Sequence, residues 1–223
     1  MRVVKRATRI IGRPFIGLIT TTSLLHVAMA VGLLVFPSVA PSPAEGAQIE
    51  QPPWDICFVP GERRCTQVVV NALDAAKMTV LVQAYSFTSP QIAQALVRAH
   101  QRGVKVEVIL DKSQLTEQAS CADLLTHASI PTMIDAHHRR GIAHNKVMII
   151  DGETVITGSF NFSRRAEENN AENVLLVSDK AMAARYTKNW HDHALHSDPY
   201  AGRASNDEKL CARPSKKAKA KKP

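Results

Sequence analysis

Aromatic residues are scarce in this chain of 223 residues, of which Phe, Trp and Tyr make up only 5%. A folded part with so few aromatic side chains lacks the aromatic-rich surface that holds many proteins at a membrane interface. The four cysteines contain no C-x-x-C pair, so the common cysteine motifs of zinc and redox sites are absent. The composition therefore disfavours a lipid-surface function and a thiol-redox function.

Acidic residues are also absent from the leader, residues 1–44. The leader has five basic residues near its start, a long apolar run over residues 15–36, and an exit rich in small residues, with Ser42 and Ala44 in a small-x-small pattern. This order predicts an export signal, and a retained membrane anchor is the alternative because the apolar run is long. We expect an exported protein, periplasmic or secreted, that contacts a membrane only if the leader is retained.

Net positive charge is absent from the middle of the chain, although the whole chain carries a formal charge of +8. The leader and the Lys-rich tail hold ten of the 28 basic residues, which leaves eighteen basic against twenty acidic residues between them. Bulk charge therefore indicates no nucleic-acid partner for the folded part. We expect the C-terminal segment 201–223 to be disordered, with weak attraction to phosphate as the alternative.

An even number of cysteines in an exported chain favours disulfides. Cys57 and Cys65 are near enough in sequence to close a short loop around a turn-like segment. The pairing of Cys121 and Cys211 stays open at this point.

Apolar residues alternate between helical and strand periods from residue 66 onward. We expect helices over residues 66–77, 91–102, 117–128 and 180–196, and strands over residues 78–87, 104–110, 130–134 and 172–177. Two further strands flank Asp151 and Gly152, which form a strong hairpin signal. This alternation predicts an α/β fold, with a mixed β-sheet flanked by helices on both faces, in one domain over residues 55–200 after a linker at 45–54.

The stretch HNKVMIIDGETVITGSFNFS, residues 144–163, places ionisable side chains in an otherwise apolar strand. Side chains two residues apart share a face of a strand, so His144 and Lys146 point to one side. The polar residues of GSFNFS also share a face, and the hairpin brings them near: Ser159, Asn161 and Ser163. An imidazole, an ammonium, a carboxamide and a hydroxyl suit an anionic phosphodiester, because they supply a nucleophile or proton carrier and donors for phosphate oxygens.

Asp151 completes the spacing H-x-K-x4-D and is therefore kept among the candidate catalytic residues. In a continuous strand its side chain would point to the opposite face from that of His144. It also stands where a tight turn needs Asp before Gly, which favours a turn-forming role.

The spacing H-x-K-x4-D followed by GSFNFS resembles the HKD signature of the phospholipase D superfamily. The blocks QAYSFTSPQIAQAL, GVKVEVILDKSQ and AEENNAENVLLV are similar to the small exported bacterial endonucleases of that superfamily, the Nuc type, over about residues 57–196. The resemblance implies cleavage of DNA, with RNA as a second substrate, through a covalent phosphohistidine on His144 and without metal or other cofactor. It also implies phosphate contacts from Lys146, Ser159 and Asn161, and a carboxylate, Glu172, that orients the histidine.

A double displacement at phosphorus needs a second histidine, because one imidazole attacks while another protonates the leaving oxygen. The sequence has no second H-x-K-x4-D copy. A symmetric homodimer, in which two motifs face each other across a two-fold axis, supplies the missing group. The small members to which the resemblance points are likewise dimeric.

Several polar clusters lie outside the motif. Arg139 and Arg140 before it, and Arg164 and Arg165 after it, are candidates for contacts to a nucleic-acid backbone, with plain charged loops as the alternative. For HDHALH, residues 191–196, we expect a surface or interface role and no metal, since only His193 and His196 share a helix face. Tyr85 is interpreted as a core residue more readily than as a cleft residue.

Three functions compete at this stage. The leading hypothesis is an exported, dimeric, non-specific endonuclease. The alternatives are a phospholipase D that acts on lipid headgroups and a non-catalytic nucleic-acid-binding protein. The intact set of His144, Lys146, Ser159, Asn161 and Glu172 argues against the last.

Overall fold

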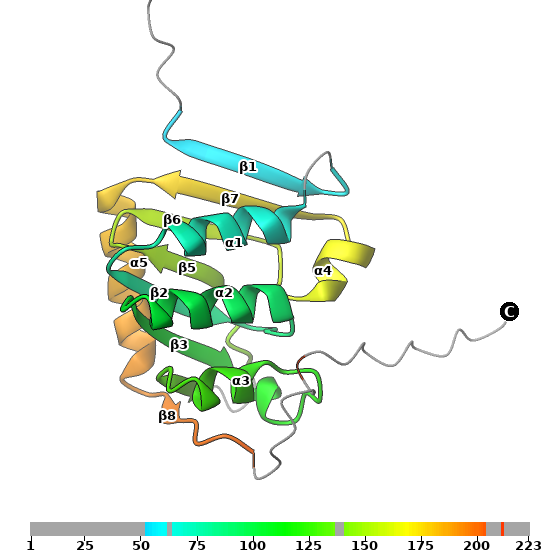
Figure 1. Cartoon of the computed structure of the whole chain (residues 1–223), viewed down its shortest axis with the longest axis vertical. Coiled ribbons are helices and arrows are strands. Elements are labelled where there is room, and N and C mark those ends of the chain that lie inside the picture. The colour runs from blue at the N-terminus through cyan, green and yellow to red at the C-terminus, as the bar shows by residue number, and fades with distance from the viewer. Residues whose placement is uncertain (1–51, 62–63, 137–140, 204–210, 212–223) are drawn as a thin grey trace, which may run out of the picture. The chain divides into compact units, whose positions relative to one another are not determined.

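The computed structural model describes residues 52–61, 64–136, 141–203 and 211 of the chain. In these residues eight strands form one mixed sheet in the order β1-β7-β6-β5-β2-β3-β4-β8 (Figure 1). The strands are β1 (Trp54–Val59), β2 (Thr79–Ala84), β3 (Lys105–Asp111), β4 (Thr132–Asp135), β5 (Lys146–Ile150), β6 (Thr154–Gly158), β7 (Glu172–Ser178) and β8 (Asp198–Pro199).

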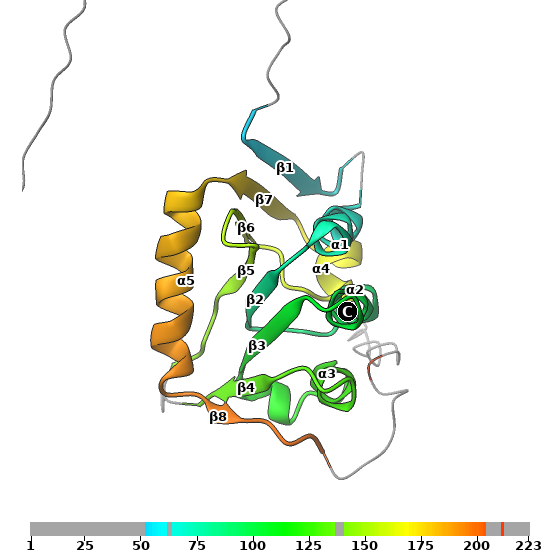
Figure 2. The ribbon, with the colours of Figure 1, turned by 60° about the vertical axis from the view of Figure 1, so that its left-hand side comes forward.

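Helices cover both faces of the sheet, as the sequence predicts (Figure 2). On one face lie α1 (Cys65–Ala75), α2 (Pro90–Gln101), α3 (Ala122–His127) and α4 (Arg164–Asn169), and a 3-10 turn, η1 (Lys112–Leu115), follows β3. The long helix α5 (Lys180–Ala194) lies alone on the other face. The predicted α/β fold with a mixed, doubly covered sheet is confirmed.

The sheet is mixed because two kinds of connection build it. Helical crossovers through α2 and α3 make β2, β3 and β4 parallel, since parallel neighbours need a long connection. A tight turn makes β5 and β6 antiparallel, and β7 runs antiparallel to β6 after a connection that contains α4. The predicted hairpin at Asp151 and Gly152 joins β5 to β6, and both residues have a positive φ, 55° and 66°, a conformation that Asp and Gly adopt more readily than most residues.

Alternate residues along the strands pack into two apolar layers, one on each face of the sheet. In β5, Met148 and Ile150 belong to the layer beneath α1, α2 and α3. Val147 and Ile149 belong to the layer beneath α5, together with the buried Trp190. The indole of Trp190 donates to the carbonyl oxygen of Val82 at 2.9 Å, which satisfies its polar atom inside this layer.

Some elements differ from the sequence-based expectation. The helix expected over 117–128 begins only at Ala122, because Cys121 donates its backbone N–H to the carbonyl of Phe87 and is tied into a disulfide. Strand β1 was not expected, because it follows Pro52 and Pro53 and its first residue fell in the predicted linker. The short α4 was also missed, since its six residues are mostly polar and carry no apolar period.

Two disulfides lie at opposite margins of the fold. Cys57–Cys65 confirms the short loop expected from sequence, and Cys121–Cys211 ties the chain beyond β8 to the start of α3. Nearby, the Asp123 carboxylate accepts hydrogen bonds from the Tyr200 hydroxyl at 2.7 Å and from Arg203 Nε at 2.6 Å. Burial, and then the bond to Asp123, raise the pKa of Tyr200 to about 12.

Among the residues that the structure describes, none of the helices combines the length and the apolar character needed to cross a bilayer. The predicted leader lies outside the described residues, as do most of the linker and most of the C-terminal segment 201–223. Within that segment residues 201–203 and 211 are described, and Arg203 and Cys211 are bonded to the fold, so the expected disorder is wrong for these two residues.

We expect the two disulfides to stabilise the fold unequally. Their cysteines are separated by 8 and by 90 residues, and chain entropy predicts about 2.5 and about 4.5 kcal/mol for loops of these sizes. Urea unfolding of the paired Cys→Ala variants measures both losses, with the wild type as reference. A loss for Cys121 and Cys211 no greater than that for Cys57 and Cys65 would contradict the prediction.

Candidate active site

The polar side chains of the motif gather at one edge of the sheet. Lys146 pairs with Ala84 at the end of β2, and Gly158 at the end of β6 pairs with Val174. When the antiparallel pairing of β5, β6 and β7 is continued past these pairs, the residues at His144 lie beside those that follow Gly158 and beside the start of β7. The hairpin therefore brings the two halves of the motif together, as the sequence predicts.

His144 and Lys146 lie on the same side and share an aromatic neighbour. His144 is exposed, and its ring centroid lies 4.6 Å from that of Tyr85, at an interplanar angle of 58°. Lys146 is only 7% exposed, and its Nζ lies 5.2 Å from the Tyr85 centroid. Tyr85, which sequence patterning favoured as a core residue, is half-buried and packs directly against both side chains.

The Lys146 ammonium is positioned by the backbone carbonyl of His144. Its Nζ donates to the carbonyl oxygen of His144 at 2.7 Å. Burial lowers the pKa of Lys146, and the negative charge of Glu172 opposes that shift. A partly desolvated cation beside an exposed imidazole suits an anionic ligand.

Glu172 and Ser159 form a second polar pair at this edge. Ser159 Oγ donates to Glu172 Oε2 at 2.5 Å, and Asn170 Nδ2 donates to Oε1 at 2.7 Å. Ser159 Oγ in turn accepts from the backbone N–H of Asn173 at 3.1 Å. In the described part of the chain no hydrogen bond joins Glu172 to the His144 ring, so the orienting role implied by the resemblance stays a prediction.

Buried side chains and backbone hydrogen bonds fix the position of the segment GSFNFS, residues 158–163. Phe160 and Phe162 are buried in the core, and the carbonyl of Phe162 accepts from the N–H groups of Thr88 and Ser89, each at 3.0 Å. Asn161 Oδ1 is buried and has no hydrogen-bond partner among the described residues. At Gly158, where φ is 140°, a Cβ would overlap the carbonyl oxygen of Asn173, so glycine is required where β6 meets β7.

Ser163 was expected on the same face as Ser159 and Asn161, but it caps a helix. Its Oγ accepts from the N–H of Ala166 at 3.2 Å and caps α4. A capping hydroxyl satisfies a free N–H group of the first helical turn. The polar set expected on this face thus reduces to Ser159 and Asn161.

Asp151 lies at the other end of β5 from His144. Its carboxylate accepts from three backbone N–H groups ahead of and at the start of β2: Lys77 at 2.9 Å, Met78 at 2.7 Å and Thr79 at 2.9 Å. Burial alone would raise the pKa of Asp151, but these N–H groups outweigh it and the pKa is lowered. Placing Asp151 in the catalytic set is therefore corrected: the residue that completes the motif fastens the hairpin to β2.

The structure describes two of the four candidate arginines. Arg164 and Arg165 form the first turn of α4, directly after Ser163, with Arg165 exposed. Arg139 and Arg140 lie outside the described residues.

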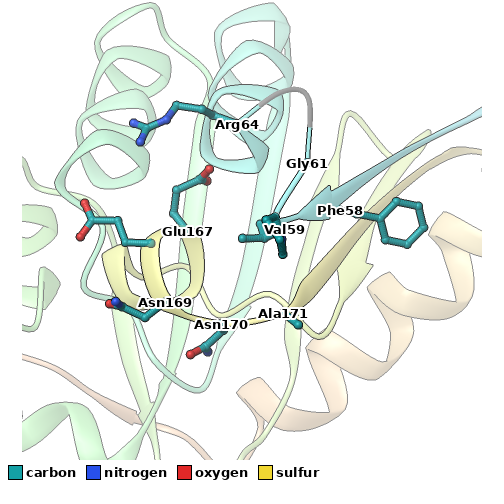
Figure 3. Close-up of a pocket in the computed structure, with 10 residues that line it drawn as sticks. Phe58, Val59, Gly61, Arg64, Glu167, Asn169, Asn170 and Ala171 are labelled. Carbon is teal, nitrogen blue, oxygen red and sulfur yellow. The ribbon is translucent and has the colours of Figure 1, made fainter.

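A cavity of about 570 Å³ lies beside this edge, between the loop after β1 and the turn after α4 (Figure 3). Arg64, Glu167 and Glu168 give it mixed charge, and Glu167 Oε2 accepts from the N–H of Thr66 at 2.7 Å. The cavity reaches Asn170, but neither His144 nor Lys146 lines it. In one chain, His144 instead stands on an exposed surface.

A fold with an H-x-K motif and a partner segment at one sheet edge defines a class of phosphodiester-processing proteins, and comparison with known proteins identifies the family. A family model described as cardiolipin synthase, PLD-like domain, matches residues 69–193. The chain belongs to the phospholipase D superfamily, which includes phosphodiester hydrolases.

Individual relatives agree with this assignment. A protein named phospholipase D from Rickettsia felis is 44% identical over 134 residues, which cover 60% of this chain and 66% of the relative, slightly under two thirds of its length. The crystal structure of Nuc from Salmonella typhimurium is 35% identical with a TM-score of 0.63, over 67% of this chain and 99% of Nuc. NucT from Helicobacter pylori is 26% identical with a TM-score of 0.61, over 66% of this chain and 98% of NucT. The predicted similarity to the Nuc-type branch is confirmed.

Asp151→Ala should destabilise the fold by about 1–3 kcal/mol, because three N–H groups lose their acceptor and alanine disfavours a positive φ. Asp151→Asn should cost less, because Asn adopts this φ and keeps one acceptor. Urea unfolding measures both losses, and phosphodiesterase activity per folded chain should persist in both variants. A loss of activity without a loss of stability would return Asp151 to the catalytic set.

The same contacts predict a pH dependence. The pKa of Asp151 is lower in the folded chain, so its stabilising effect is complete above the ordinary aspartate pKa and disappears as the pH falls through the lowered value. Stability should therefore fall less steeply toward acid pH in Asp151→Asn than in the wild type.

Proposed function

We propose that this protein is an endonuclease that hydrolyses phosphodiester bonds of DNA, and of RNA, with little sequence preference and without a metal in the chemical step. The observation that carries the proposal is the meeting of His144, Lys146, Ser159, Asn161 and Glu172 at one sheet edge. These are the groups that the resemblance to the superfamily implies, and the pairing of the consecutive strands β5, β6 and β7 supports their lying together.

The chemistry follows from the functional groups. The neutral His144 imidazole attacks phosphorus, the bond to the leaving oxygen breaks, and a second imidazole gives that oxygen its proton. The second imidazole then takes a proton from water, which attacks the phosphohistidine and restores His144. Lys146, Ser159 and Asn161 stabilise the phosphoryl oxygens, and the carboxylate of Glu172 stabilises a positively charged imidazole.

The second imidazole is assigned to another copy of the chain. One H-x-K-x4-D motif is present, and a single chain exposes His144 on an open surface. Ile142, two residues from His144, is 50% exposed, and Leu115, in η1 after β3, is 45% exposed. Apolar side chains flanking a polar half-site suit a two-fold interface that encloses two copies of the motif.

Nucleic acid is favoured over lipid as the substrate. The chain covers nearly all of Nuc and NucT, and Arg164 and Arg165 follow the site at α4, where they can contact a polynucleotide backbone. Hydrolysis of lipid headgroups is the second candidate, because the Rickettsia felis relative is named phospholipase D.

The two disulfides and the sequence of the leader support a location outside the cytoplasm.

Substrate assays test the proposal directly. The purified full-length chain is incubated in excess EDTA with plasmid DNA, RNA and phosphatidylcholine vesicles. We expect cleavage of DNA, and a loss of at least about a thousandfold in His144→Ala because the nucleophile is removed. The exposed His127 on α3 supplies the matched control, His127→Ala, which should keep full activity. Lipid turnover without DNA cleavage would overturn the nuclease assignment.

A mixing experiment tests the shared site. Wild type and His144→Ala are combined under conditions where subunits exchange. With equal amounts, activity per wild-type chain should fall to about half, and with a ninefold excess of the variant to about a tenth, because mixed dimers contain one functional imidazole. Activity per wild-type chain that does not change with the ratio would show that each chain acts alone.

A further inference from the structure

A second polar cluster lies at the end of α5, on the opposite face of the sheet from the residues around His144. It consists of Asp135 at the end of β4 and of His193 and His196. His193 Nδ1 lies 2.7 Å from Asp135 Oδ2, and His196 Nε2 lies 3.5 Å from the same oxygen. One potential ligand atom from each residue lies within 4.8 Å of the others.

Strand parity and helix period explain why these residues meet. In β4, Ile134 packs into the core beneath α1–α3, whereas Met133 packs beneath α5, so Asp135 also points toward α5. His193 lies in the last turn of α5, and His196 lies in the turn directly after the helix, where its N–H donates to the carbonyl of His193 at 3.2 Å. Their side chains are 19% and 29% exposed, and the surface or interface role expected for HDHALH stays a prediction.

Two buried carboxylates lie side by side in this region. The Asp135 side chain is fully buried, and in the neighbouring strand it is paired in register with Asp111, which is only 1% exposed. Asp111 accepts from the N–H groups of Ser113 at 2.8 Å and Ala143 at 2.7 Å. Two buried carboxylates on adjacent strands are costly unless cationic groups or ions compensate them.

We propose that Asp135, His193 and His196 bind a divalent transition-metal ion, with Zn²⁺ the best match. Two imidazole nitrogens and one carboxylate oxygen are ligands that Zn²⁺ takes at about 2.0–2.2 Å, which sets tetrahedral ligand atoms about 3.3 Å apart. The distances of 2.7 and 3.5 Å to Asp135 Oδ2 bracket this spacing. The ion replaces the proton between His193 Nδ1 and Asp135, and the partial exposure of both imidazoles gives it access.

The ion joins the end of α5 to the end of β4. These elements are 58 residues apart in sequence at the contact between Asp135 and His193, so a shared ion acts as a cross-link between the lone helix and the sheet. None of its ligands belongs to the set around His144. Metal binding here and metal-independent cleavage at His144 are therefore separate properties.

Cobalt titration tests the site in the untagged full-length chain after removal of metal with a chelator. Co²⁺ bound by these three residues and a water should show the strong visible absorption of a tetrahedral site, at one ion per chain, and Zn²⁺ should displace it. Zn²⁺ should also raise the melting temperature, because it binds only the folded chain. His196→Gln keeps the bond between Asp135 and His193, and should weaken Co²⁺ and Zn²⁺ binding at least about tenfold.

The same helix supplies the matched control. His191 is exposed on α5 and is absent from the cluster, so His191→Gln should bind Co²⁺ within about twofold of the wild type if the three assigned residues form the site. Equal binding by wild type and His196→Gln, or no rise in melting temperature with Zn²⁺ in the wild type, would overturn the proposal. The cluster would then be a hydrogen-bonded carboxylate and imidazole group that fixes α5.

Discussion

The hydrogen-bond register of β5, β6 and β7 is the constraint on which the candidate site depends. Because Met148 pairs with Ile156 and Gly158 pairs with Val174, one edge of the sheet receives the start of β5, the end of β6 and the start of β7. A slip of one residue would turn the side chains of a strand to its other face. The Asp151 turn, bonded to the backbone at the start of β2, holds this register from the opposite end.

The same edge carries polar groups on both faces of the sheet. His144 and Lys146 lie beside Tyr85, whereas Asp135 meets His193 and His196 beneath α5. The buried Asp111 accepts from Ala143 and so secures the segment that leads into His144. The carboxyl ends of β2, β3 and β4 lie at this edge, where an open α/β sheet usually presents its functional groups. The site is thus supported by the parallel half of the sheet and completed by the antiparallel half.

The proposed chemistry and the proposed homodimer are connected. The acid and base chemistry of a phosphohistidine cycle needs two imidazoles, and one chain offers a single motif on an exposed surface. Enclosure by a second copy would supply both the missing imidazole and the walls of a cleft. The exposed Ile142 and Leu115 are among the apolar side chains of the described residues that such an interface could bury.

Sequence periodicity and turn chemistry determined the α/β class, the hairpin at Asp151 and the shared side of His144 and Lys146, because each depends on residues a few positions apart. The tertiary structure alone decided the late start of α3, the place of Tyr85 beside His144, and the meeting of Asp135 with His193. These features depend on contacts between distant segments, such as Cys121 with Phe87. Local patterns set which face a side chain occupies, but only packing sets what lies opposite that face.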